Sequence, residues 1–438
     1  MNNRNFTAPQ LLVVSFFSVI LLGSLLLSLP CSSYMPTPYL DALFTSTSAV
    51  CVTGLVVVDT GTHWTYLGQT IIMLLIQIGG LGVMSFAGLF AFLMGRKIFL
   101  RERLLMQQTI NVSAVGGIVK IFRYLLGFTF LVEALGALIL AIRWTPLMGL
   151  KKALWFGLFH SISAFNNAGF DLFGNFKSLT EFNADITVNM VISSLIIVGG
   201  LGFYVCYELF NYRQAKKLSL HSKVVLRTTI ILILTGTVLL FVNEYHHAFK
   251  DMALGTKLLA AYFQSVSPRT AGFNTVDLNS LLLPSQLLLI ILMFIGASPG
   301  STGGGIKTTT LAIIVATVSS QLQGKRDTQI LERRIENSAV YQAVTVVILY
   351  AFVLLLITYL LTLTDSASLI KTAFEVASAL GTVGLSLGLT TSLSEFGKIL
   401  IIFTMFLGRV GPLTLGFALA SRKKQTEIRY AKGKIMIG

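Results

Sequence analysis

Long apolar stretches follow one another along the chain, and short polar segments separate them. A helix needs roughly 20 mostly apolar residues to cross a lipid bilayer. Stretches of that length lie at about residues 10–30, 66–94, 117–143, 186–211, 224–243, 284–320, 339–363 and 395–419. The pattern therefore predicts an all-α polytopic membrane protein with eight spans.

Between each odd-numbered span and the next lies a shorter segment, and the four such segments are alike. They read LFTSTSAVCVTGL (43–55), LFHSISAFNNAGF (158–170), AYFQSVSPRTAGF (261–273) and AFEVASALGTVGL (373–385). Aligned on Gly54, Gly169, Gly272 and Gly384, each has an aromatic residue ten positions earlier and a bulky apolar residue one position later. The chain thus contains four repeats of one helix–pore loop–helix unit. The repeats lie at residues 1–95, 96–213, 214–325 and 326–420, and a tail follows at 421–438.

The aligned glycines predict a cation path. Irregular backbone at membrane depth is tolerated where it lines a watery cavity or is buried in protein, and glycine permits the positive φ that turns carbonyls one way. Four such loops around a pseudo-fourfold axis make rings of carbonyl oxygens that replace a cation's hydration shell. TVGL (382–385) also resembles the start of the potassium-channel sequence TVGYG. The predicted ion-binding residues are Val52, Thr53, Gly54, Asn167, Ala168, Gly169, Thr270, Ala271, Gly272, Thr382, Val383 and Gly384.

The second span of each repeat carries a further glycine motif: IGGLG (78–82), VGGLG (198–202), IGASPG (295–300) and LGRVG (407–411). In the first two copies, close helix packing by small residues is the favoured interpretation. In the third, the run SPGSTGGGIKTTT (298–310) interrupts the helix; it is not a Walker A loop, because Ile306 separates Gly305 from Lys307. In the fourth, Arg409 stands inside an apolar span, where a charge is costly and usually functional.

Composition and charge support a membrane protein and define its orientation. The 438 residues are 54% hydrophobic and 12% charged, with a formal net charge of +15, whereas soluble domains carry about 25% charged residues. Twenty of the 33 Lys and Arg lie beside every second span boundary, at position 4 and within 96–103, 213–227, 325–334 and 422–434. The positive-inside rule then places both termini in the cytoplasm. The excess charge is a topology signal, so no nucleic-acid partner is expected.

The loop glycines, the STGGGIK break (301–307) and GRVGPLT (408–414) resemble the Trk/Ktr/HKT superfamily of potassium uptake proteins, and most closely the KtrB-type pore subunits of bacterial Ktr systems. The resemblance runs from about residue 10 to the C-terminus. It implies potassium uptake across a bacterial plasma membrane by a homodimer with one pore per chain. It also implies a KtrA-type cytoplasmic ring that binds ATP or ADP, no cofactor in this chain, and no metal beyond potassium. Sodium dependence is left open.

The resemblance also implies that the break in the third repeat, residues 296–307, is an intramembrane loop that gates the pore below the filter. A glycine-rich loop moves easily, its hydroxyls satisfy its own backbone, and Arg409 is the natural donor to its free carbonyls. The alternative is that the loop and Arg409 are only packing elements. The predicted gating residues are Gly296, Gly300, Ser301, Thr302, Gly303, Gly304, Gly305, Lys307 and Arg409.

Several other polar residues allow two interpretations. For Glu133, inside a span, a helix-packing hydrogen bond is favoured over a place on the ion path. Arg269 is expected to lie behind its loop, because a cation facing the pore would repel potassium. Asp59, Asp171 and Asp277 follow three of the loops and either draw cations to the mouth or are ordinary solvated residues.

Two other functional classes are alternatives. An ion-coupled transporter with alternating access suits broken helices, but its repeats are typically two inverted halves. A membrane enzyme needs a clustered nucleophile, base or metal set, and none is evident from the sequence, so no enzymatic activity is expected.

Overall fold

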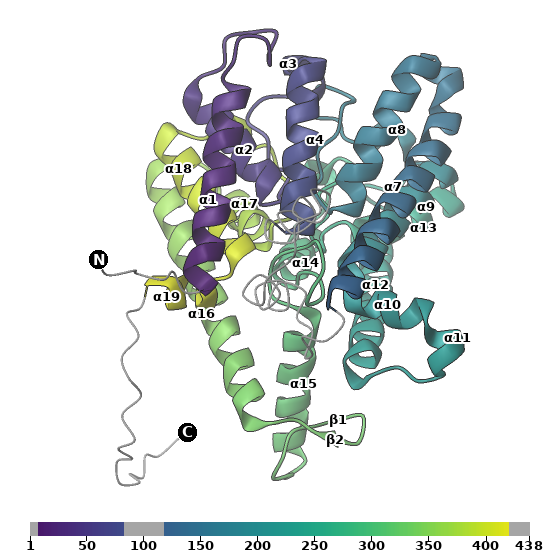
Figure 1. Cartoon of the computed structure of the whole chain (residues 1–438), viewed down its shortest axis with the longest axis vertical. Helices are drawn as coiled ribbons and strands as arrows, with labels where there is room; N and C mark the ends of the chain where they lie inside the picture. Colours follow the sequence, from purple (N-terminus) through teal and green to yellow (C-terminus); the bar gives the residue numbers. More distant parts are fainter. Residues whose placement is uncertain (1–7, 83–117, 420–438) are drawn as a thin grey trace.

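The computed structural model describes residues 8–82 and 118–419, and these residues form helices almost throughout (Figure 1). The first predicted repeat contains α1 (Ala8–Leu27), α2 (Tyr39–Val50), α3 (Thr60–His63) and α4 (Tyr66–Leu81). The second contains α7 (Ile118–Met148), α8 (Leu150–Phe165), the 3-10 turn η1 (Thr180–Phe182), α9 (Ile186–Leu201), α10 (Phe203–Phe210) and α11 (Tyr212–Ala215).

The second half of the chain repeats this order. The third predicted repeat contains α12 (Leu220–Glu244), α13 (Leu254–Val266), η2 (Leu278–Ser280), α14 (Leu283–Phe294) and α15 (Thr308–Leu322). A two-stranded antiparallel hairpin of β1 (Gln329–Ile330) and β2 (Arg333–Arg334) leads to the fourth repeat. That repeat contains α16 (Asn337–Thr364), α17 (Leu369–Gly381), η3 (Thr390–Ser392), α18 (Glu395–Val410) and α19 (Pro412–Leu419).

Four long apolar helices begin the four repeats. Within the described ranges, α1, α7, α12 and α16 are each long and apolar enough to cross a membrane. Their outward sides carry large exposed hydrophobic residues, among them Leu22, Leu138, Leu234 and Leu355, which are 53–70% exposed. Apolar surface on this scale is typical of contact with lipid tails.

Two other predicted spans, 186–211 and 395–419, are broken, which corrects the expectation of continuous helices there. Helices α9 and α10 meet at an angle of 101°, and a single residue separates α18 from α19. Gly82, Gly202 and Gly411 lie at these ends with φ values of 83°, 95° and 87°. A residue at positive φ ends an α-helix, and glycine adopts that φ without strain. The predicted interruption of 284–320 is present, between α14 and α15.

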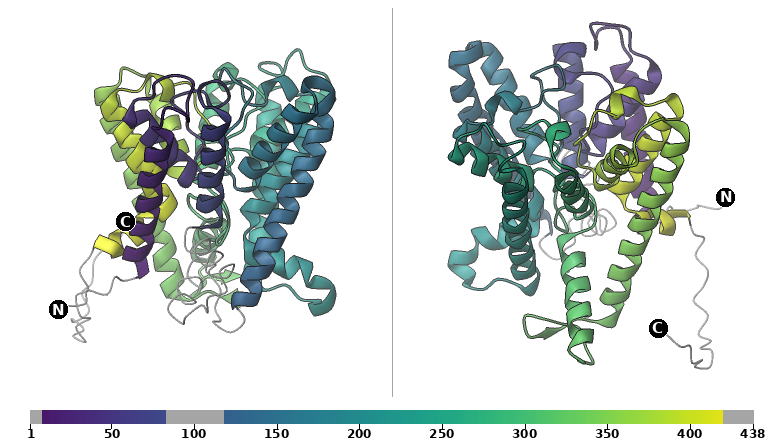
Figure 2. Two further views of the ribbon diagram at one scale, coloured as in Figure 1. Left: turned by 45° about the horizontal axis from the view of Figure 1, so that its top comes forward. Right: turned by 180° about the vertical axis from the view of Figure 1, so that it is seen from behind.

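Some predictions concern residues outside the described ranges. They are the end of the 66–94 span, the basic groups at position 4 and at 96–103, and the tail at 421–438. The number of membrane crossings and the repeat boundaries therefore stay predictions. Helix α11 and the β1–β2 hairpin overlap two of the basic segments, and they lie at the same end of the molecule, opposite α3 (Figures 1 and 2).

In three of the repeats, the short helix packs on the long helix before it in the same way. Ser46 on α2 donates to the carbonyl of Ile20 at 2.7 Å, and Ser161 on α8 donates to that of Glu133 at 2.6 Å. Ser265 on α13 makes the same bond to Ile233, at 2.8 Å. Gly23, Gly136 and Gly236 on the long helices face these hydroxyls, and a Cβ there would collide with them. Small residues thus bring the short helices deep into the bundle.

Candidate functional site

The four short helices α2, α8, α13 and α17 end at loops whose aligned glycines touch one another. A Cβ on Gly54 would overlap the backbone of Ala168 and Gly169, and one on Gly169 that of Ala271 and Gly272. The same holds onward: Gly272 faces Val383 and Gly384, and Gly384 faces Thr53 and Gly54. The contacts return to the first glycine, so the four loops form a closed ring, which we call the glycine ring.

The backbone of the glycine ring has the same conformation in all four loops. Each glycine has positive φ, between 71° and 98°, and so has the residue two positions before it. Those residues are Val52, Asn167, Thr270 and Thr382, with φ between 51° and 76°. Positive φ is rare outside glycine, and here it recurs at equivalent positions four times. Because the sign of φ changes between neighbouring residues, successive peptide groups can turn the same way, as a carbonyl-lined path requires.

Buried serines hold the glycine ring from behind. The N–H groups of Gly54 and Gly384 donate to the hydroxyls of Ser48 and Ser378, each at 3.0 Å. In the second repeat, Ser163 instead donates to the carbonyl of Phe170 at 2.7 Å. The third repeat has Ser267, one position later, bonded to the carbonyl of Phe273. The sequence reasoning missed these serines, although a serine six residues before the glycine is visible in three of the four segments.

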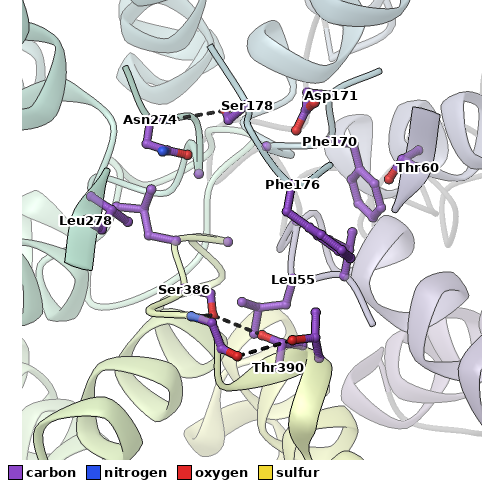
Figure 3. A pocket seen from close by; sticks show the side chains of 18 of the residues that line it. Leu55, Thr60, Phe170, Asp171, Phe176, Ser178, Asn274, Leu278, Ser386 and Thr390 are labelled. Carbon is purple, nitrogen blue, oxygen red and sulfur yellow. Dashed lines mark hydrogen bonds between the residues drawn. The ribbon is translucent and has the colours of Figure 1, made fainter. Parts of the chain in front are cut away.

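A cavity of about 290 Å³ opens on the outer side of the glycine ring (Figure 3). All four ring glycines line it, as do Asp59, Asp171 and Asp277. The ring of Phe176 projects over its centre in Figure 3, and this side chain is 50% exposed.

The three aspartates at this cavity also anchor the loops that surround it. Asp59 accepts the N–H of Thr62 at 2.9 Å and that of Phe176 at 2.8 Å. Asp277 accepts from Asn279 at 3.0 Å. These aspartates therefore line the cavity and also hold its loops, and an effect on cations stays a prediction.

Asp171 lies in the loop that connects Gly169 to α9, and its half-buried side chain lines the cavity. Burial raises the pKa of its carboxyl to about 7, and the nearby charge of Asp59 raises it further, while the N–H of Phe173 opposes both. Near neutral pH the carboxyl therefore exists in both charged and neutral forms.

The break between α14 and α15 lies directly against the glycine ring on its other side. We call residues 295–307 the inner loop; Ile295 and Ile306 pair at its ends in a parallel bridge. The N–H of Gly304 donates to the hydroxyl of Thr382 at 3.1 Å. A Cβ on Gly303 would collide with the hydroxyl of Thr270. The inner loop thus touches two of the positive-φ residues of the ring.

The second repeat holds the other side of the inner loop. The N–H of Ser298 donates to Gly200 at 3.0 Å, and Gly300 accepts from the N–H of Phe203 at 2.9 Å. Thr302 donates through its N–H to Gly199 and through its hydroxyl to Phe165, both at 3.3 Å. Ser301 bonds within the loop, to the carbonyl of Ser298 at 2.6 Å.

Two cations hold the carbonyls of the inner loop. The ammonium of Lys307 donates to Gly303 at 2.8 Å and to Gly304 at 3.3 Å. The guanidinium of Arg409, on α18, donates to the carbonyls of Thr302 and Gly79. The bond to Thr302 is the contact that the sequence predicts for Arg409. This bond joins the inner loop to the fourth repeat. The bond from Arg409 to Gly79 joins the fourth repeat to the first.

The glycine motifs on the second helices pack against the short helices. Cβ atoms on Gly79, Gly199 and Gly408 would overlap the carbonyls of Val50, Phe165 and Leu380, respectively. These carbonyls all lie four positions before the ring glycine of their repeat. Close packing is therefore what these glycines do, in the fourth repeat as in the first two.

Two buried charged residues lie behind the ring loops. Glu133 on α7 accepts from Asn166 at 2.9 Å and from Gln77 at 3.2 Å, which is the helix-packing role that the sequence favours. Arg269 is 3% exposed and donates to the carbonyl of Thr229 at 3.2 Å. It thus contacts the long helix of its own repeat, as a residue behind its loop does.

Comparisons with known proteins agree with one another. A family model described as TrkH, Cation transport protein, matches residues 3–427. The Ktr system potassium uptake protein B of Bacillus subtilis is 44% identical over 435 residues, covering 99% of this chain and 97% of that protein. The potassium/sodium uptake protein NtpJ of Enterococcus hirae is 39% identical over 446 residues, covering 99% and 98%.

A solved structure shares the fold. The crystal structure of the potassium transporter TrkH from Vibrio parahaemolyticus matches with a TM-score of 0.77, over 96% of this chain and 86% of that one. At 18% sequence identity, this match speaks for the arrangement of the helices alone.

Proposed function

Because the chain belongs to the TrkH family of cation transport proteins, we propose that it takes up potassium across the bacterial plasma membrane as the pore subunit of a Ktr-type system. It is a transport protein and not an enzyme, as the names of its family and relatives state. The observation that carries the proposal is the closed contact of Gly54, Gly169, Gly272 and Gly384.

The glycine ring would act as the selectivity filter. Carbonyl oxygens of the three residues up to and including each ring glycine would replace the water around potassium. The repeated positive φ values in the four loops support this assignment. The short helices end at the ring, so their partial negative charges would favour a cation there. The ion-binding residues of this proposal are Val52, Thr53, Gly54, Asn167, Ala168, Gly169, Thr270, Ala271, Gly272, Thr382, Val383 and Gly384.

The inner loop would be the gate. Its contacts with Thr270 and Thr382 support a position under the proposed filter, and the charges of Lys307 and Arg409 would raise the barrier to a cation there. Opening needs the loop to leave these contacts, and its glycines let the backbone change conformation at low cost. The gating residues are Gly296, Gly300, Ser301, Thr302, Gly303, Gly304, Gly305, Lys307 and Arg409.

Control would come from a separate cytoplasmic partner. The relative from Bacillus is named as part of a system, and we propose a KtrA-type ring that binds ATP or ADP and pulls on α15 from its cytoplasmic end. Two copies of this chain would sit on that ring as a homodimer, each with its own pore and with both termini in the cytoplasm. Sodium dependence belongs to the proposal too, since the Enterococcus relative is named a potassium/sodium uptake protein.

Rubidium flux into proteoliposomes tests the pore. The purified chain, with its partner ring, should pass rubidium down its gradient with equal sodium on both sides, and potassium should compete better than sodium. Flux that stops without a second ion gradient would favour alternating access. Gly54→Ser should lower the potassium-to-sodium ratio at least about fivefold, because its side chain enters the ring at a positive φ.

A matched control and a partner experiment complete the test. Gly127 on α7 has open space around its Cβ position, so Gly127→Ala should leave the ratio unchanged. An unchanged ratio in Gly54→Ser would remove Gly54 from the filter. Full, nucleotide-responsive transport by the chain alone would contradict the separate regulatory partner.

A further inference from the structure

One equivalent position in the four short helices carries a different residue in each repeat. Nine positions before the ring glycine stand Thr45, His160, Phe263 and Glu375. All four lie within the buried interior. Two of these side chains reach the chain segment that follows the ring glycine, and two do not.

Glu375 on α17 holds the segment after Gly384. Its side chain is fully buried, and one carboxylate oxygen accepts the hydroxyl of Ser386 at 2.8 Å. The other oxygen accepts the hydroxyl of Thr390. Ser386 also accepts the N–H of Gly388 at 3.0 Å. Figure 3 shows Ser386 and Thr390 together at the edge of the outer cavity.

His160 on α8 does the equivalent in the second repeat. Its Nδ1 lies 2.7 Å from the carbonyl of Phe156, and its Nε2 accepts the N–H of Leu172 at 3.3 Å. Leu172 lies three residues after Gly169, as Ser386 lies two after Gly384. In both repeats a polar side chain thus joins the short helix to the chain segment that follows the ring glycine.

At this position, the described residues of the other two repeats make no such bond to the segment after the ring. Thr45 bonds back to its own helix, at the carbonyl of Asp41 at 2.9 Å, and Phe263 is apolar. Around the ring, Gly169 touches Gly272, which touches Gly384, which touches Gly54. The second and fourth repeats therefore occupy opposite corners of the ring.

We propose that Glu375 and His160 are positioning residues that brace the outer end of the glycine ring at two opposite corners, and that the brace maintains discrimination between potassium and sodium. The inference rests on the proposed filter. A ring of carbonyls discriminates by the spacing and number of its oxygens, so a corner that can shift outward discriminates less. Buried hydrogen bonds to a carboxylate are among the stronger ones in proteins, which suits a brace.

The brace of the fourth repeat is tested from both sides. In proteoliposomes, potassium and sodium compete with rubidium uptake, and the ratio of their potencies measures the discrimination between them. Glu375→Leu and the double variant Ser386→Ala with Thr390→Val should each lower this potassium-to-sodium ratio about fivefold or more. Glu375→Gln should lower it less, because the amide oxygen still accepts one hydroxyl. Combining Glu375→Leu with the double variant should add little, since both changes remove the same bonds.

Two control variants separate bracing from general stability. Thr45→Val removes a buried hydroxyl at the same position of the short helix. Ser392→Ala, in η3, removes a hydroxyl that donates to the carbonyl of Leu389. Both should retain the parental ratio. A residue that only stabilises the fold would lower the uptake of both ions in proportion, without moving the ratio. The double variant changes two loop hydroxyls and stays informative even if Glu375→Leu does not fold.

The brace of the second repeat has its own variant. His160→Phe installs the residue that the third repeat carries at this register, and it should lower the ratio about threefold. His160→Gln, which can still accept the N–H of Leu172, should restore most of it.

The outcomes distinguish the two levels of inference. Folded Ser386→Ala/Thr390→Val and Glu375→Gln proteins with the parental ratio would overturn the brace while the filter stands. A parent protein without potassium preference would contradict the proposed function itself.

Discussion

The glycine ring and the inner loop lie against each other, yet they are held in opposite ways. Every ring glycine is enclosed by the backbone of its neighbours, so contact leaves no room for a side chain. The inner loop comes from one repeat only and is held by hydrogen bonds from the second and fourth repeats, and Arg409 of the fourth also bonds to Gly79 of the first. Steric contact among four equal loops resists any local change, whereas polar bonds to one loop can be released and remade. The comparison thus separates a part fixed by steric contact from a part held by polar bonds, and the second is the part proposed to move.

The largest effect is expected from filling the ring. A Cβ on Gly384 would lie 3.0 Å from the Cα of Gly54, at a φ of 98°. Gly384→Ala should lower rubidium flux roughly ten- to hundredfold, the factor that about 1–3 kcal/mol of backbone strain gives. Flux into proteoliposomes measures it. Gly255→Ala on α13, where nothing lies within 4 Å of the Cβ position, is the control; equal flux in both variants would refute the steric account of the ring.

Removing the inner loop should act in the opposite direction. Deletion of residues 300–304 removes the segment beneath the ring, and flux should rise about tenfold and lose its dependence on the partner. Arg409→Ala, which frees the carbonyls of Thr302 and Gly79, should raise flux about threefold.

A surface cation provides the control for Arg409. Arg143 forms an exposed ion pair with Asp185 at 2.7 Å, so Arg143→Ala should leave flux unchanged. Well-folded deletion and Arg409→Ala proteins that transport no faster than the parent would mean that the gate lies elsewhere.

The smallest effect concerns charge at the mouth. The pKa of Asp171 is raised to about 7, so its carboxyl is mostly neutral below that pH and charged above it. A negative charge at the mouth concentrates cations, so uptake at low potassium should rise about twofold between about pH 6 and about pH 8 outside. Asp171→Asn should flatten this rise, measured as initial rubidium uptake at fixed internal pH. A variant that keeps the full pH profile would exclude Asp171 as its source.

The sequence predicted the repeated features well because their causes are local. A positive φ and a missing Cβ each require glycine, so Gly54, Gly169, Gly272 and Gly384 stand out at equal register without any knowledge of their contacts. The long helices α1, α7, α12 and α16 were predicted equally directly, because an apolar run of that length has few other uses.

The breaks in the second helices were predicted less well. Gly202 and Gly411 lie in apolar runs that look continuous, and the glycine motifs there indicated packing. Packing is indeed what Gly199 and Gly408 do. The last glycine of each motif does something different, because it turns the chain at positive φ, and the sequence does not distinguish these two uses of glycine.

From the sequence alone it follows that the chain is a helical membrane protein, that four loops are alike, and that a cation in an apolar span needs a partner. The packing of the helices is needed to show which groups meet: that the loops close into a ring, that Arg409 bonds to Thr302 and Gly79, and that Glu375 reaches Ser386 and Thr390. The reason is physical. Helix length, φ and side-chain volume are properties of one residue or one segment, whereas a hydrogen bond between distant residues depends on how every intervening helix packs.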